Sequence, residues 1–237
     1  MTPYYETELG KLYHGDCLQI MPGLEPVDLV LTDPPYGIGC ARAIHCTKPS
    51  RPSTYLMQKK YEDEKWDIRP PDRIFHIMQT KSKNQIIWGG NYFTEALPES
   101  RCWLYWDKMF ENTTNFSHGE LAWTSFKFGI KQIRISSKSE TNGGKNRVHP
   151  TQKPKRLIIW CLSVSDQAEH HATILDPYLG SGTTAIACER LKRKWIGIEI
   201  EEKYCEIAAK RIEENLTVME RIERSEKGIT KKTGLLF

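Results

Sequence analysis

Residues 27–36 read Val27-Asp28-Leu29-Val30-Leu31-Thr32-Asp33-Pro34-Pro35-Tyr36. The first six form an apolar run that predicts a buried β-strand. The two prolines restrict the backbone and lack N–H donors, so we expect a stiff turn where the strand ends. The carboxyl end of a parallel strand is where open α/β sheets bind their ligands. The stretch therefore predicts a strand of such a sheet that runs directly into a functional turn.

The turn offers one carboxylate, carbonyls that can only accept hydrogen bonds, and one aromatic ring. Asp33 and a carbonyl suit the two N–H groups of an exocyclic amine, and Tyr36 suits stacking on the ring that carries the amine. We therefore expect a flat, amino-bearing ring as the ligand. The alternative is a proline turn that only caps its strand.

A second stretch, near the other end of the chain, has the pattern strand, glycine turn, helix. Residues 172–176 predict a strand, Gly180 and Gly182 follow it, and the helix runs through residues 185–190. Glycines at such a turn let a ligand approach the backbone closely. A P-loop is excluded, because no lysine follows the second glycine where that motif requires one. The alternative is a purely structural glycine turn.

A further predicted strand, residues 194–200, carries Glu199 near its end. This acid comes about twenty residues after the glycines, a spacing that suits a carboxylate binding ribose hydroxyls. The turn, the helix and the strand-end acid together favour a nucleoside-containing cofactor.

Two motifs, Asp33-Pro34-Pro35-Tyr36 and Asp176-Pro177-Tyr178-Leu179-Gly180-Ser181-Gly182-Thr183-Thr184, together resemble those of the amino-group DNA methyltransferases that use S-adenosylmethionine. The catalytic motif comes first and the glycine motif last, which resembles the circularly permuted β class of that family. His149-Pro150-Thr151-Gln152-Lys153-Pro154 is similar to a cofactor-side motif of that class, and Gly15-Asp16-Cys17-Leu18 is similar to its acidic contact to the cofactor adenine.

The resemblance implies a role for each matching residue. The catalytic residues it implies are Asp33, Pro34, Pro35 and Tyr36. The residues it implies for binding S-adenosylmethionine are Asp16, Lys153, Asp176, Tyr178, Gly180, Ser181, Gly182, Thr183, Thr184 and Glu199, with Lys153 near the methionine end. Adenine N6 in double-stranded DNA is the implied target, because an aspartate at position 33 matches the adenine-type motif. The implied reaction is in-line attack by the amine of a flipped-out base, without a strong general base.

The chain departs from the family pattern in two places. Tyr178 stands where the family usually has phenylalanine, and residues 129–148 alone occupy the place of a sizeable target-recognition region. Other readings stay open: an N4-cytosine DNA methyltransferase, an RNA or protein-amide methyltransferase, and a non-catalytic DNA-binding relative. The order of the motifs speaks against the RNA and protein enzymes, and the intact glycine motif speaks against the non-catalytic relative.

Composition excludes several classes of protein. Apolar residues make up 39% of the 237 residues and charged residues 27%, as in an ordinary globular domain. No apolar run is long enough for a transmembrane helix, and the first residues lack the pattern of a signal peptide. The seven cysteines contain no C-x-x-C pair and read as reduced, buried thiols of a cytoplasmic protein. We expect no metal site at Cys40, His45 and Cys46, because a second paired set is lacking.

Positive charge gathers in two segments. Residues 40–61 hold five bases and no acid, and residues 127–156 hold nine bases and one acid. Two basic segments that flank the proposed reaction site favour binding of a polyphosphate, here DNA. The candidate DNA-binding residues are Arg42, Lys48, Arg51, Lys131, Arg134, Lys138, Lys145 and Arg147. The alternative is that each segment is a solvated loop.

Alternation of predicted strands and helices indicates a doubly wound, mostly parallel, seven-stranded Rossmann-like sheet with helices on both faces. The predicted strands are residues 11–14, 27–32, 84–88, 101–107, 119–128, 172–176 and 194–200, and the predicted helices are 17–21, 72–83, 155–164, 185–190 and 202–215. We expect a single methyltransferase domain over residues 1–237, with a mobile substrate loop at 37–65, a short basic loop at 129–148 and a charged tail at 217–237. A homodimer and a cognate restriction enzyme or specificity partner are left open.

Overall fold

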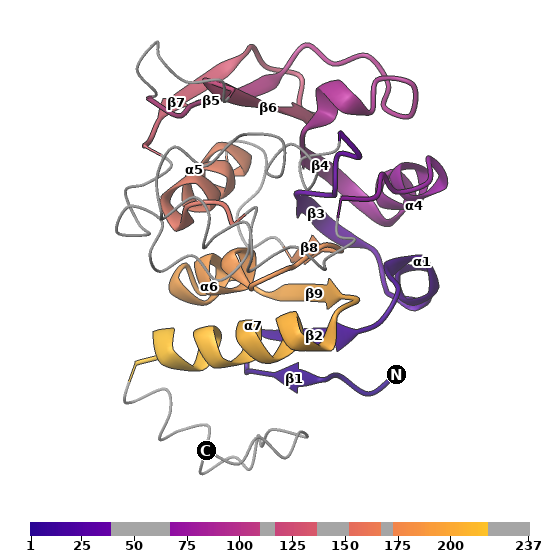
Figure 1. Ribbon diagram of the computed structural model, residues 1–237, viewed down its shortest axis with the longest axis vertical. Coiled ribbons are helices and arrows are strands. Elements are labelled where there is room, and N and C mark those ends of the chain that lie inside the picture. The colour runs from indigo at the N-terminus through magenta and orange to yellow at the C-terminus, as the bar shows by residue number, and fades with distance from the viewer. Residues whose placement is uncertain (39–66, 110–116, 137–151, 167–172, 218–237) are drawn as a thin grey trace, which may run out of the picture.

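The computed structural model describes residues 1–38, 67–109, 117–136, 152–166 and 173–217. These residues form one nine-stranded sheet with helices on both faces (Figure 1), in the strand order β1-β2-β9-β8-β3-β4-β6-β5-β7. The predicted doubly wound α/β fold is therefore confirmed, with two strands more than the seven expected.

The strands are β1 (Tyr5–Glu6), β2 (Gly10–His14), β3 (Val27–Thr32), β4 (Ser82–Trp88), β5 (Trp103–Asp107), β6 (Gly119–Thr124), β7 (Lys131–Arg134), β8 (Ile174–Asp176) and β9 (Trp195–Glu199). The α-helices are α1 (Cys17–Ile20), α4 (Arg73–Lys81), α5 (Lys155–Ser165), α6 (Thr183–Arg190) and α7 (Glu202–Asn215). Two short 3-10 helices, η1 (Met21–Gly23) and η2 (Gly90–Tyr92), follow α1 and β4. Each of the seven predicted strands and five predicted helices is present, with bounds shifted by a few residues.

The sequence did not predict β1 and β7, which are the two outermost strands of the sheet. β1 has two residues and β7 has four, and β7 alternates half-buried and exposed side chains without a buried apolar run. Such short edge strands give almost no periodic signal. The prediction of a loop over residues 129–148 is thus wrong at 131–134, which pair in parallel with β5.

Five of the eight strand pairings are parallel, and they include the whole run from β2 through β9, β8 and β3 to β4. β6 runs antiparallel to both of its neighbours, β4 and β5. The carboxyl ends of the parallel strands therefore meet at one edge of the sheet, where β6 delivers its first residues instead of its last.

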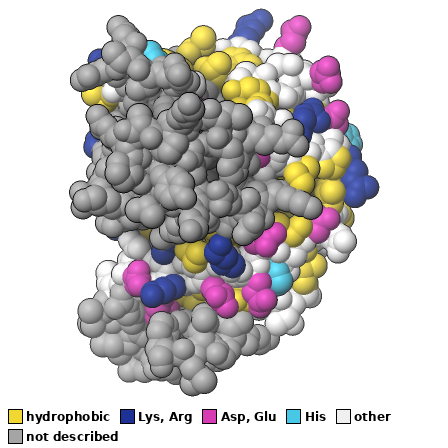
Figure 2. Space-filling view, viewed as in Figure 1, with side chains coloured by type: hydrophobic (Ala, Val, Ile, Leu, Met, Phe, Trp, Pro, Cys, Tyr) yellow, Lys and Arg dark blue, Asp and Glu magenta, His cyan; other side chains and the backbone are white. Residues whose placement is uncertain are grey.

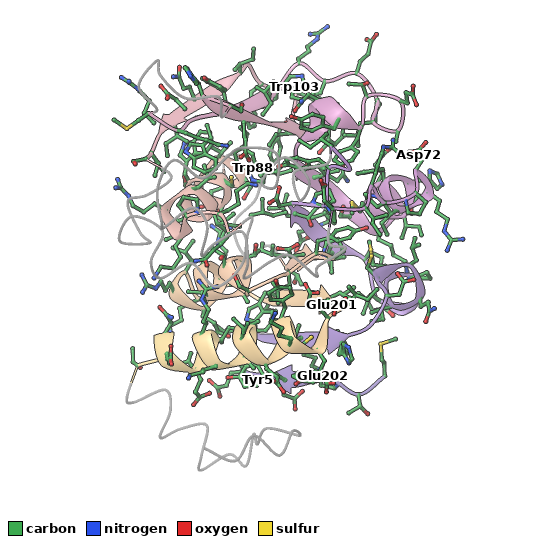
Figure 3. The ribbon with its side chains drawn as sticks, in the orientation of Figure 1. Tyr5, Asp72, Trp88, Trp103, Glu201 and Glu202 are labelled. Atoms are coloured by element: carbon green, nitrogen blue, oxygen red, sulfur yellow. The ribbon has the colours of Figure 1, made fainter. Side chains whose placement is uncertain are left out.

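Two apolar cores lie on opposite faces of the sheet. Leu29 and Leu31 of β3 face the core that contains α5, α6 and α7, while Val30 faces the core that contains α1 and α4. The same alternation in β4 places Trp88 in the first core, and Figure 3 shows this indole close to α5. A strand buried on both faces reads as a continuous apolar run, which is why β3 was readily identified.

Side chains join β1 to helix α7 at the lower end of the molecule in Figure 1. The Tyr5 hydroxyl of β1 donates a hydrogen bond to Glu213 of α7 over 2.8 Å, and Figure 3 shows Tyr5 close to that helix. Beneath it, a buried network links Glu189 Oε1 to the Thr7 hydroxyl at 2.5 Å and to the Trp195 indole N–H at 2.8 Å. The N-terminal residues are thus bonded to the C-terminal third of the chain.

Several expectations fall outside the described residues. These are most of the predicted substrate loop at 37–65, most of the basic loop at 129–148 and nearly all of the tail at 217–237. Gly37 and Asp67, at the two ends of the first of these gaps, are close together, because the Gly37 N–H donates a hydrogen bond to Asp67 Oδ1 over 2.8 Å. The five described cysteines are free and buried, as predicted. Within the described ranges no helix is long and apolar enough to cross a membrane, and no three or more His, Cys, Asp or Glu side chains are grouped so that they could hold a metal ion.

Gly10→Ala should destabilise the fold, because the register of β2 and β9 sets Gly10 opposite Trp195. A Cβ at Gly10 would lie 2.2 Å from the Trp195 ring. We expect a loss of about 1–3 kcal/mol in the free energy of unfolding, the usual cost of overpacking. Chemical denaturation measures it.

The matched control is Gly23→Ala, since Gly23 is exposed and a Cβ there meets nothing within 4 Å. It should stay within about 0.5 kcal/mol of the parent. Equal stability of the two variants would contradict the tight packing of β2 on β9.

Candidate active site

The two sequence motifs meet at one edge of the sheet. β3 lies between β8 and β4, so the turn that follows β3 adjoins the turn that follows β8. The Thr32 hydroxyl, at the end of β3, donates a hydrogen bond of 2.7 Å to Asp176 Oδ1, at the end of β8. The predicted meeting of stretches 144 residues apart is confirmed.

Asp176 holds the glycine turn in shape. Its second oxygen, Oδ2, accepts from the Thr184 hydroxyl at 2.6 Å, and Oδ1 also accepts the Tyr178 N–H at 3.1 Å. The side chain is 4% exposed, and burial raises its pKa to about 6 despite the hydroxyl donors. These hydrogen bonds from Thr32, Thr184 and the Tyr178 N–H fix the turn that would face a cofactor.

The glycines of this turn are required by the backbone. Gly180 and Gly182 have φ of 54° and 81°, the left-handed region that other residues rarely adopt. At Gly182 a Cβ would also lie 2.9 Å from Ala208 of α7. The chain then enters α6, so the first turn of that helix, with Thr183, faces the same edge.

Glu199 is fixed at the end of β9 by the backbone N–H groups of Gly180, Ile200 and Glu201. Oε2 accepts from Gly180 at 2.8 Å, and Oε1 accepts from Glu201 at 2.9 Å. Figure 3 shows Glu201 where the chain passes from β9 into α7. Burial raises the pKa of Glu199, although these N–H groups oppose the shift. This acid therefore ties the glycine turn to the neighbouring strand end.

Asp16 lies beside this acid. Gly15, the residue before it, donates its N–H to the Glu199 carbonyl over 2.9 Å, because β2 pairs with β9. Asp16 Oδ1 caps α1 by accepting from the Leu18 N–H at 2.8 Å. The two carboxylates thus lie at the ends of adjacent strands.

Two further predicted cofactor residues, Ser181 and Tyr178, have partners within the protein. The Ser181 side chain is buried, and its hydroxyl accepts from Arg211 of α7 at 2.7 Å. The Tyr178 hydroxyl hydrogen-bonds the Cys17 thiol, whose pKa burial raises to about 11. Tyr178 thereby bridges the glycine turn to α1.

In the turn that follows β3, both oxygens of the Asp33 carboxylate accept hydrogen bonds. Asp33 Oδ1 accepts the Tyr36 hydroxyl at 2.6 Å, and Oδ2 accepts the Lys153 ammonium at 2.5 Å. Pro34 is buried and Pro35 is half-buried. Lys153, which is predicted to lie beside the methionine end of the cofactor, thus contacts the carboxylate of Asp33.

Lys153 also pairs with a carboxylate that the sequence analysis missed. Its Nζ lies 3.0 Å from Glu120 Oε2 on β6, and Glu120 forms a second ion pair with Lys108. The exposed fractions are 8% for Lys153, 18% for Asp33 and 20% for Glu120. Two ammonium groups and two carboxylates therefore alternate in a row at the sheet edge.

The row ionises in a definite order. Burial would raise the pKa of Glu120, but Lys153 and Lys108 hold it at about 2. Burial raises the pKa of Asp33, Lys153 opposes this shift, and the Glu120 anion adds to it. Burial would lower the pKa of Lys153, but the two carboxylates raise it, so this group stays protonated.

Tyr36 is packed against a second tyrosine. Its ring stacks on Tyr92 of η2, with centroids 4.9 Å apart and planes inclined by 25°. Gly89, with φ of 69°, leaves room for the ring, since a Cβ there would lie 2.1 Å from Tyr36 Cε1. Tyr92 remains 41% exposed. The two rings form an aromatic platform beside Asp33.

The described part of the basic segments gives a mixed result. Arg134 ends β7 at the same sheet edge as Asp33, four strand spacings or about 19 Å away, and it pairs with Asp107 at 2.9 Å. Lys131 begins β7, toward the opposite edge, with Nζ 5.5 Å from the Phe128 ring. On the described part of the face in Figure 2, positive and negative side chains are interspersed. The other candidates, Arg42, Lys48, Arg51, Lys138, Lys145 and Arg147, lie outside the described residues.

Four residues of the site were not found from the sequence: Glu120, Lys108, Tyr92 and Arg211. Functional side chains are expected where parallel strands end, but β6 runs antiparallel and brings its first residues to this edge. A polar residue at the start of an apolar strand is a usable signal only once strand direction is known. Tyr92, two residues beyond Gly90 after β4, was the most accessible of the four to pattern reasoning.

Comparison with known proteins gives one consistent result. A family model described as DNA methylase matches residues 45–210, a stretch that includes the glycine turn and begins after Tyr36. The chain is 26% identical over 261 residues to Type II methyltransferase M2.LlaDCHI of Lactococcus lactis subsp. cremoris, covering 91% of this chain and 93% of that protein.

Two solved structures share the fold. The M1.HpyAVI–SAM complex matches with a TM-score of 0.53 at 22% identity, over 86% of this chain and all of that one. The PvuII DNA methyltransferase, named as cytosine-N4-specific, matches with a TM-score of 0.59 at 18% identity, over 96% and 94%. At these identities the likeness extends to the fold alone.

Asp176→Asn should change how stability depends on pH. Because the folded protein holds this proton up to about pH 6 and the unfolded chain releases it near pH 3.8, the parent loses stability as pH rises between these values. The variant lacks this loss. Relative to the parent, it should gain about 3 kcal/mol between pH 3.5 and 7, at 1.36 kcal/mol per pKa unit. Denaturation curves at several pH values measure it.

Asp28→Asn is the matched control with the opposite sign. Lys83 and the Thr173 N–H lower the pKa of Asp28, so the parent gains stability relative to that variant as pH rises. If the curves of stability against pH for both variants run parallel to that of the parent, the raised pKa assigned to Asp176 is refuted.

Proposed function

We propose a reaction for this chain on the basis that it belongs to the N6/N4 family of DNA methylases. The reaction is transfer of the methyl group of S-adenosylmethionine to the exocyclic N6 of adenine in double-stranded DNA. The observation that carries it is the junction of the two turns, since it sets the carboxylate of Asp33 beside the turn held by Asp176. An amine held at Asp33 would then lie beside a cofactor held by the glycine turn.

The residues fit S-adenosylmethionine by their chemistry. Asp16 and Glu199 offer carboxylates to hydroxyl and amino groups of a nucleoside, and Gly180 presents no side chain that would block close approach. When bound, the cofactor supplies a methyl group on a positively charged sulfonium. In this proposal the Gly180–Thr184 turn, Tyr178 and Asp176 shape its binding site.

Asp33 is the acceptor for the target amine. Its carboxylate takes one N–H, the Pro34 carbonyl takes the other, and the nitrogen lone pair is left to point at the methyl group. Tyr36, braced by Tyr92, provides a face for the base, which must first leave the helix at a cost of a few kcal/mol. Rate then comes from alignment and local electrostatics.

Adenine is preferred over cytosine because Asp33, and not serine, stands in the turn. N4 of cytosine is the second candidate, since both bases present an exocyclic amine to the same acceptors. Cytoplasmic location, a homodimer and a cognate restriction enzyme stay predictions from the sequence.

Asp33→Ala should lower methyl transfer by about 100-fold or more, because it removes the acceptor that aligns the amine. Affinity for S-adenosylmethionine should stay within a few-fold, because Asp33 makes none of the contacts that shape the glycine turn. Tritium transfer to unmethylated bacterial DNA and calorimetry measure the two. Nucleoside mass spectrometry of the parent's product distinguishes N6-methyladenine from N4-methylcytosine.

Asp72→Ala is the control, an exposed acid paired with Arg69 on the surface. It should retain both properties. Equal loss of methyl transfer and cofactor affinity in Asp33→Ala would contradict the role given to Asp33.

Affinity for DNA should fall steeply with salt. The expected log–log slope is about −0.9 per phosphate contacted, and Arg134→Ala should make it shallower by about one unit. Arg190→Ala is the matched control, since Arg190 ends α6, a helix that begins at the active edge. Fluorescence anisotropy with labelled duplex measures the slopes. A flat response of the parent would argue against DNA.

A further inference from the structure

We propose that Glu120 is a positioning residue of the methyl-transfer site: it takes over the ammonium of Lys153 when the target amine binds Asp33. The inference rests on the proposed function and names a residue outside the catalytic motif. Glu120 comes from the antiparallel strand β6, whereas Asp33 and Asp176 come from parallel strands.

The need for such a residue follows from the partners of Asp33. Both carboxylate oxygens are engaged, one by the Tyr36 hydroxyl at 2.6 Å and the other by Lys153 at 2.5 Å. An ammonium this close draws charge away from the carboxylate and weakens it as an acceptor for a neutral amine. Asp33 can hold a base firmly only if Lys153 withdraws from it.

Lys153 cannot simply be released, because a buried ammonium without a partner is costly. Its side chain is 8% exposed, and its Nζ already lies 3.0 Å from Glu120 Oε2. The distances to the two carboxylates differ by only half an ångström, so a small rotation of the lysine moves its charge from one to the other. Glu120 is therefore positioned to receive it.

Glu120 is ionised, so it can accept the lysine as an anion. Lys108 forms the second ion pair of Glu120 and, with Lys153, holds its pKa at about 2 despite burial. The fixed anion also raises the pKa of Asp33. Among the described residues, the titratable groups that face Asp33 are Lys153 before α5, Glu120 on β6, Asp176 at the end of β8 and Tyr36 of its own turn.

The decisive variant is Glu120→Gln in the full chain, assayed with tritiated S-adenosylmethionine and unmethylated bacterial DNA. With the anion gone, Asp33 is the one carboxylate left to Lys153 among the described residues, so Asp33 becomes both more acidic and a weaker acceptor. We expect kcat to fall about tenfold or more. The acidic limb of the kcat/KM profile, which reports groups of the free enzyme, should move to lower pH, because Asp33 must be ionised to bind the amine. Affinity for S-adenosylmethionine should stay within about twofold.

Two further variants separate positioning from folding. Glu120→Asp keeps the charge and should restore most of kcat and the parent's acidic limb. Lys108→Met leaves the Glu120 anion less neutralised, so the limb should move to higher pH, the opposite direction. Asp28→Asn is the matched control: Asp28 is also paired with a lysine, at 2.7 Å, and is 25% exposed, but it lies near the other end of β3. Its profile should match the parent's.

A fall in kcat with an unmoved limb would mean that Glu120 only supports the fold, and an unchanged kcat and limb would equally overturn the inference. If Glu120→Gln does not fold, the Lys108→Met profile decides alone. Failure of the proposed function is recognisable separately, since the parent itself would then transfer no methyl group to DNA.

Discussion

The site depends on one hydrogen bond, from the Thr32 hydroxyl to the Asp176 carboxylate. Strand pairing sets β3 beside β8, but two turns that leave neighbouring strands can still diverge. The bond from Thr32 and the bond from Thr184 to the same buried carboxylate hold the two turns together. A buried acid with all its oxygens engaged is expensive to ionise and hard to replace. This free-energy cost is incurred where the turn after β3 meets the turn after β8.

The charges at the site are arranged by strand direction. Parallel strands bring Asp33, Asp176 and Glu199 to one edge by their last or following residues. The reversed strand β6 adds Glu120 from its beginning, beside Lys153, which comes just before α5. Each ion pair in this row joins residues from two different segments of the chain. The electrostatics of the site are therefore a property of topology and not of any motif.

That distinction explains what could be predicted from the sequence. β3, the glycine turn and β9 were identified because buried strands and left-handed glycines leave local signals. The meeting of the two motifs followed from the rule that parallel strands deliver ligands at their carboxyl ends. Glu120, Lys108 and Arg211 had no such signal, since their roles arise from contacts across strands and helices. The roles of Lys153 and Asp176 were predicted toward the cofactor, and no sequence pattern revealed their bonds to Asp33 and Thr32.

The bond between the Gly37 N–H and Asp67 Oδ1 anchors the backbone just beyond Tyr36 to a side chain thirty residues further along the sequence. Gly37 has φ of 69°, and a Cβ there would lie 2.5 Å from Arg69 Cβ, so the chain leaves this turn against the segment that leads into α4. The geometry of the turn from Asp33 to Tyr36 therefore depends on residues outside its own motif, and a change at Asp67 can alter the site without replacing any residue in it.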